Sequence, residues 1–93
     1  MAFNYFIAYD LCKPGQNYEA VTQCIKALGP NARMQQSLYY VQSDMPLEDV
    51  HTFIRGAMDP NDRLSIIWAR DAFVSNYNLG DLHILQSAFQ NAA

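Results

Sequence analysis

The residue best suited by type and position to take part in chemistry is Asp10. It ends an apolar run from Phe3 and precedes the turn-forming pair Pro14-Gly15. A carboxylate in this position has two uses. It accepts hydrogen bonds from the backbone amides of the following turn, as Asp commonly does. Alternatively, it projects into a site, where its oxygens suit a hard cation such as Mg²⁺. The residues alone leave both uses open.

Groups that could contact a nucleic acid are few and dispersed. Lys13 and Arg33 are expected in loops near strand ends, where they could contact phosphates, and the Ser37 hydroxyl could bind a phosphate as well. Exposed rings of Tyr39 and Tyr40 could stack on bases. The competing interpretation makes the two cations solvated surface charges, Ser37 a turn residue, and the tyrosines fillers of the two sheet faces.

Several other kinds of site are not indicated. The six basic residues are scattered and the net charge is −3, which predicts no strong nucleic-acid footprint. Cys12 and Cys24 show neither a Cys-x-x-Cys pair nor zinc spacing, and no disulfide framework is expected. His51 and His83 have no nucleophile or second ligand at a suitable spacing, and Pro14-Gly15 lacks the glycines and lysine of a P-loop.

The elements that must position these residues follow from the apolar periodicity. The segment from Phe3 to Asp10 is apolar on both faces, which is typical of a central strand. Turn residues and helix-breaking pairs delimit the remaining elements. In chain order, the pattern predicts a helix over about 17–28, strands over 32–35 and 38–42, a helix from about Pro46 to before Asp59-Pro60, and a strand over 64–69.

Two of these boundaries depend on single features. The bend between the second and third strands is expected near Gln36-Ser37, although no glycine marks it. Asp62 is expected to cap the turn that precedes the last strand.

The order strand, helix, strand, strand, helix, strand is that of a ferredoxin-like α+β fold. Right-handed crossovers place both helices on one face of a four-stranded antiparallel sheet. The other face then needs cover, and its aromatic residues favour a homodimer. With 51% hydrophobic and 16% charged residues, we interpret 1–93 as one domain with a core over about 3–70 and a C-terminal extension over 71–93, which could be exchanged between the subunits of a dimer.

The chain start and the cysteine usage bear on the compartment. The first ten residues lack the basic region of a signal peptide, and no apolar stretch is long enough to span a membrane. Free cysteines fit a reducing environment. We therefore expect a cytoplasmic protein with no membrane partner.

Four short motifs resemble the CRISPR-associated protein two family and its stand-alone relatives, which include virulence-associated protein D. The similarity covers about Tyr5 to Ala69. The matching residues are Tyr9-Asp10 at the end of the first strand, Leu28-Gly29 closing the first helix, Gln36-Ser37-Leu38-Tyr39-Tyr40, and Asp62-Arg63-Leu64 opening the last strand. The segment from Lys13 to Tyr18 looks more like the divergent stand-alone branch, because the family often carries more basic residues there.

The resemblance implies a ferredoxin-like homodimer. Many members of that family are metal-dependent nucleases that act on RNA or DNA, and others are non-catalytic adaptors. The family's proposed metal ligand, one from each protomer, corresponds here to Asp10, with Mg²⁺ or Mn²⁺ as the cation. Two functions are therefore carried forward: a metal-dependent nuclease built on paired Asp10 side chains, and a dimeric adaptor that binds nucleic acid or a protein without turnover.

Overall fold

The computed structural model of the chain describes residues 2–12, 18–71 and 75. Its elements follow the predicted order, with bounds that differ from the predicted ones by at most about three residues, the largest difference being the earlier end of the second helix. They are β1 (Phe3–Asp10), α1 (Tyr18–Leu28), β2 (Asn31–Gln35), β3 (Leu38–Ser43), α2 (Leu47–Arg55) and β4 (Arg63–Trp68).

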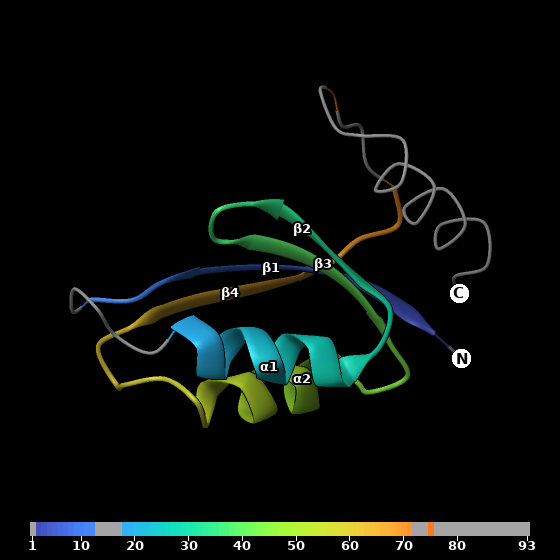
Figure 1. Cartoon of the computed structure of the whole chain (residues 1–93). Coiled ribbons are helices and arrows are strands. Elements are labelled where there is room, and N and C mark those ends of the chain that lie inside the picture. The colour runs from blue at the N-terminus through green and yellow to red at the C-terminus, as the bar shows by residue number, and fades with distance from the viewer. Residues whose placement is uncertain (1, 13–17, 72–74, 76–93) are drawn as a thin grey trace.

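The four strands form an antiparallel sheet in the order β2-β3-β1-β4, and both helices cover the same face of it (Figure 1). Strand β1 lies between β3 and β4, as its two apolar faces predicted. The β2–β3 hairpin turns at Gln36 and Ser37, as expected. This arrangement is a compact α+β ferredoxin-like fold, so the predicted fold class is confirmed.

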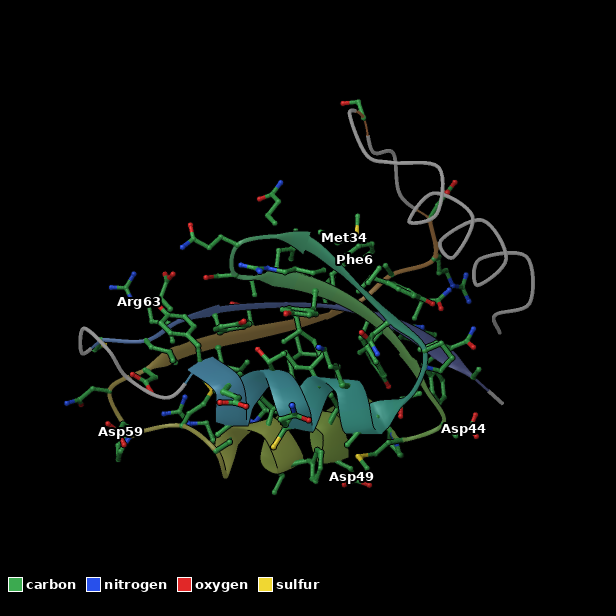
Figure 2. The ribbon with its side chains drawn as sticks, viewed as in Figure 1. Phe6, Met34, Asp44, Asp49, Asp59 and Arg63 are labelled. Atoms are coloured by element: carbon green, nitrogen blue, oxygen red, sulfur yellow. The ribbon has the colours of Figure 1, made fainter. Side chains whose placement is uncertain are left out.

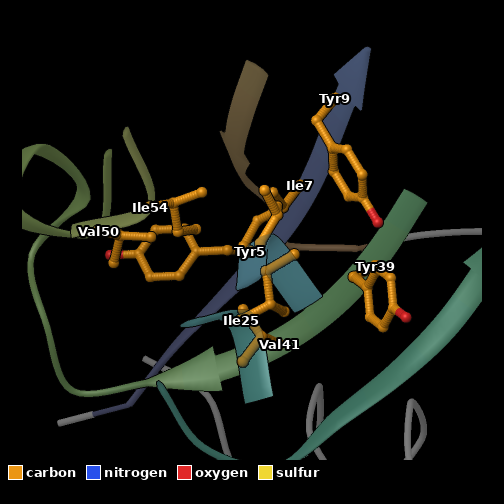
Figure 3. Close-up of a cluster of buried hydrophobic side chains, with 9 residues drawn as sticks. Tyr5, Ile7, Tyr9, Ile25, Tyr39, Val41, Val50 and Ile54 are labelled. Atoms are coloured by element: carbon orange, nitrogen blue, oxygen red, sulfur yellow. The ribbon is translucent and has the colours of Figure 1, made fainter. Parts of the chain in front are cut away.

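The main core lies between the sheet and the helices. Alternate residues of β1, namely Tyr5, Ile7 and Tyr9, point toward the helices and are buried. Val21 and Ile25 of α1 pack on them, since a spacing of four residues puts both on one helix face. The same spacing brings in Val50 and Ile54 of α2. Figure 3 shows these side chains converging, with the Tyr9 and Tyr39 rings next to each other.

A second apolar cluster covers part of the opposite sheet face. Ala32, Met34 and Tyr40 are buried there, and Phe6 packs against them. Figure 2 shows Phe6 and Met34 on the side of the sheet away from the helices. The Tyr40 hydroxyl donates a hydrogen bond of 2.6 Å to Asn4 Oδ1. Burial raises the pKa of Tyr40 to about 12, so this hydroxyl stays protonated at neutral pH.

Strand β4 differs from its predicted environment. The segment is predicted as a strand with apolar residues on both faces, but β4 is an edge strand, and Ile67 and Trp68 are 57% and 46% exposed. The Trp68 ring packs edge-on against Phe3, with the ring centroids 5.7 Å apart. Leu47, which was expected on the buried face of α2, is also exposed, because α2 begins at this residue.

Two expectations fall wholly or partly outside the described residues. The C-terminal extension is described only up to Asp71 and at Ser75, so its exchange between subunits stays a prediction. Within the described ranges, no helix is long and apolar enough to cross a membrane.

Gly29, between α1 and β2, is the glycine that the fold requires most strictly. Its φ is +153°, and a Cβ atom there would lie 2.1 Å from the Gln42 carbonyl oxygen. We therefore expect Gly29→Ala to lower the free energy of unfolding by about 2 kcal/mol in urea denaturation. Gly56→Ala is the matched control, because its Cβ would meet nothing closer than 3.5 Å and its φ is −62°. Equal stability of the two variants would contradict this account.

Candidate functional site

Asp10 lies at the end of β1, on the sheet face away from the helices. This follows from the alternation along β1, which buries Tyr9 toward the helices and sends Asp10 to the opposite side. Asp10 is exposed, and its register partner on β4 is Arg63, which is exposed as well. Among the described residues, the Asp10 carboxylate makes no hydrogen bond or ion pair. The carboxylate is therefore an exposed anionic group, available to a ligand, at the end of the sheet.

A different carboxylate binds the amides of the loop that follows β1. Asp62 is 6% exposed, and its Oδ1 accepts a hydrogen bond of 2.8 Å from the Cys12 amide. Its Oδ2 accepts another of 2.8 Å from the Asp59 amide. One alternative for Asp10 was that it accepts hydrogen bonds from the amides of the following loop. At the Cys12 amide, Asp62 is the acceptor instead. The prediction that Asp62 caps its own turn is confirmed by the Asp59 contact, and the link to Cys12 is new.

Three further hydrogen bonds involve the same loops: two hold the α2–β4 loop against α2, and one joins it to the β1–α1 loop. The Arg55 guanidinium donates to the backbone carbonyl of Asp62 over 2.8 Å and to that of Asp59 over 2.5 Å. The Cys12 thiol donates to the Asn61 carbonyl over 2.7 Å. We call Cys12, Arg55, Asp59, Asn61 and Asp62 the loop clasp. It joins the β1–α1 loop to the α2–β4 loop, directly beyond Asp10.

Among the described residues predicted to contact a nucleic acid, Arg33 does not lie beside Asp10. Arg33 is on β2 opposite Tyr39, which faces the helices, so Arg33 lies on the other face of the sheet from Asp10. Ser37 lies in the β2–β3 turn, where its carbonyl accepts a hydrogen bond of 3.2 Å from the Tyr9 amide. Lys13 falls outside the described residues. The structure thus separates Arg33 from Asp10.

Tyr39 and Tyr40 were the candidate stacking residues. Both are buried, on opposite sheet faces, so neither offers the open ring face that stacking on a base requires. For both residues, the structure therefore supports the alternative interpretation, in which they fill the sheet faces.

A single chain does not present a complete set of metal ligands. No group of three or more His, Cys, Asp or Glu side chains suited to a metal ion occurs within the part of the chain that is described. Mg²⁺ keeps several waters and binds through one or two carboxylates plus a phosphate. Asp10 by itself therefore provides one such carboxylate, and any second one has to come from elsewhere.

Comparison with known proteins supports the fold but identifies no activity. No protein-family model matches the sequence, and no curated protein matches it. Among solved structures, a hypothetical protein from Thermus thermophilus is similar, with a TM-score of 0.62 and 23% sequence identity. The similarity covers 85% of this chain and 94% of the Thermus chain. At this level of identity the likeness supports a shared fold.

Proposed function

We propose that the protein is a homodimeric, metal-dependent nuclease in which Asp10 from each protomer binds one shared Mg²⁺ or Mn²⁺ ion. The observation that carries the proposal is the contrast between two neighbouring carboxylates. Asp62 is buried and hydrogen-bonded to loop amides, whereas Asp10 is exposed and its carboxylate makes no hydrogen bond or ion pair with the described residues. A side chain that the fold does not need is available for a ligand.

The role of this chain's own residues follows from charge. Two Asp10 carboxylates brought together at a two-fold axis repel each other unless a cation lies between them. Arg63, the register partner of Asp10 on β4, carries a positive charge beside each carboxylate and would attract a phosphate to the same end of the sheet. When bound, the cation would activate water and neutralise charge on a phosphodiester. Free thiols at Cys12 and Cys24 are compatible with a reducing cytoplasm.

The proposal is tested on the wild-type protein. We expect cleavage of single-stranded RNA or duplex DNA with Mg²⁺ or Mn²⁺, and no cleavage after chelation with EDTA. Light scattering after size exclusion is expected to give the mass of a dimer. A monomer at the protein concentration of the assay would contradict a shared cation site, and so would cleavage that persists without a divalent metal.

A dimeric adaptor without turnover is the second candidate. The low number of candidate ligands favours it, because the described residues hold no group of three or more metal-ligating side chains and Asp10 alone is a sparse basis for catalysis. An adaptor would bind nucleic acid with an affinity that falls with salt, or retain a defined protein partner, without cleaving anything. Metal-independent retention of DNA by a protein with no turnover would support this candidate. Failure to retain either kind of partner would refute it.

A further inference from the structure

A groove lies on the helix side of the sheet, between α1 and the β2–β3 hairpin, away from Asp10. Its volume is about 440 Å³, within the size range of small-molecule sites. Residues from three regions line it: the end of β1, one side of α1, and the hairpin. They are Tyr9, Tyr18, Glu19, Thr22, Gln23, Lys26, Arg33, Gln36 and Tyr39.

One wall of the groove is aromatic. The Tyr9 and Tyr39 rings lie next to each other (Figure 3). Their interplanar angle is 21° and their centroids are 6.4 Å apart. Tyr18 adds a third ring 6.0 Å from Tyr9. Tyr9 and Tyr39 are buried, but Tyr18 is 43% exposed at the start of α1. Tyr18 is therefore partly open to solvent while its ring contacts the buried Tyr9 ring, and a flat ligand could stack on its exposed part.

The groove also concentrates positive charge. Lys26 from α1 and Arg33 from β2 both line it, against a single carboxylate from Glu19. This local excess occurs in a chain with six basic residues and a net charge of −3. Two of the other basic residues have partners elsewhere: Arg55 donates to the loop clasp, and Arg70 lies over the Trp68 ring. An anion is thus attracted to this groove more than to most of the surface.

Arg33, one of the two cations of the groove, acts electrostatically on Tyr9, which belongs to its aromatic wall. Burial of Tyr9 raises the pKa of its hydroxyl, while a hydrogen bond from Thr22 and the charge of Arg33 oppose that rise. The Arg33 guanidinium is held in place by a hydrogen bond of 3.2 Å to the Gln36 carbonyl. Only one of its donors is used there, so the guanidinium keeps further donors for a ligand.

We propose that this groove binds one nucleotide unit, with the base stacked on Tyr18 and the phosphate between Lys26 and Arg33. A ligand with both an aromatic ring and an anionic group matches the two walls, whereas a purely apolar or purely anionic ligand matches one of them. The unit has two possible sources, a free nucleoside monophosphate or the phosphorylated end of a single strand. Because Asp10 lies on the other face of the sheet, this site does not rest on the proposed nuclease.

Isothermal titration calorimetry with adenosine 5′-monophosphate tests the proposal. We expect binding that is tighter than that of adenosine or of inorganic phosphate alone. Arg33→Gln is expected to weaken the affinity roughly tenfold through loss of a charged hydrogen bond. Tyr18→Ala is expected to weaken it to a similar extent through loss of stacking. A 5′-phosphorylated dinucleotide then identifies the source: tighter binding than the monophosphate indicates a strand end, and weaker or equal binding indicates a free nucleotide.

Matched variants keep the test decisive. Arg70→Gln removes an equal charge outside the groove and is expected to leave the affinity unchanged. Lys26→Gln repeats the charge test on α1 in case the β2 variant folds poorly, which circular dichroism reports. Asp10→Ala is expected to bind the monophosphate like the wild type, whatever its nuclease activity. The absence of millimolar or tighter binding by the wild type overturns the proposal, as does an equal loss in Arg70→Gln.

Discussion

Asp10→Ala is expected to lower metal-dependent cleavage by about a hundredfold or more while the protein stays folded and dimeric. The size of the loss reflects how few ligands the site has: if each protomer contributes one carboxylate, the variant removes every protein ligand to the shared ion. The unchanged fold follows from the exposure of Asp10, whose carboxylate makes no hydrogen bond or ion pair with the described residues.

The control for this variant is Asp49→Ala. Asp49 is an exposed carboxylate on α2, on the helix side of the molecule, as Figure 2 shows. Its removal changes the net charge by the same amount and is expected to leave cleavage intact. Equal activity of Asp10→Ala and wild type would point to a contaminating nuclease and would end the hypothesis.

Mixed dimers give a sharper version of the test. A dimer with one wild-type and one Asp10→Ala protomer keeps a single carboxylate, and it is expected to lose most of the activity, because the cation is shared. Two independent sites, one per protomer, would instead leave half of it. Differently tagged chains that are co-expressed and purified through both tags separate these outcomes.

Much of the fold could be predicted because its signals are local. Apolar residues on both faces of the segment from Phe3 to Asp10 identified the central strand, and the four-residue spacing of apolar residues such as Val21 and Ile25 is typical of the buried face of a helix. The position of β4 was harder to predict. Its apolar residues look alike whether the strand is central or at an edge, because topology and not periodicity decides which strand has a neighbour on each side.

The candidate site was less predictable, because its contacts are long-range. Cys12 and Asp62 are fifty residues apart in sequence, and nothing near Asp62 indicates which amide it will meet. The groove likewise contains Tyr18 of α1 and Arg33 of β2, which come to line one site because α1 packs across the sheet. Arg55 donates to backbone carbonyls of the α2–β4 loop and not to a carboxylate, so charge pairing read from the sequence would not have found these contacts either.

Asp62→Ala is expected to have the largest effect on stability, a loss of about 3 to 4 kcal/mol in the free energy of unfolding. The variant leaves the amides of Cys12 and Asp59 without their acceptor, and each unpaired, partly buried amide costs about 1 to 3 kcal/mol. Urea denaturation followed by circular dichroism measures the change. Asp62→Asn is expected to cost less, because its amide oxygen still accepts one of the two hydrogen bonds.

The two aspartates are therefore expected to respond in opposite ways, and this contrast tests the assignment of roles better than either variant alone. Asp10→Ala is expected to change the free energy of unfolding by no more than about 0.5 kcal/mol, as is usual for an exposed side chain. If Asp10→Ala were as destabilising as Asp62→Ala, Asp10 would have a structural contact that requires its charge. Its availability for a metal ion, on which the nuclease proposal rests, would then be lost.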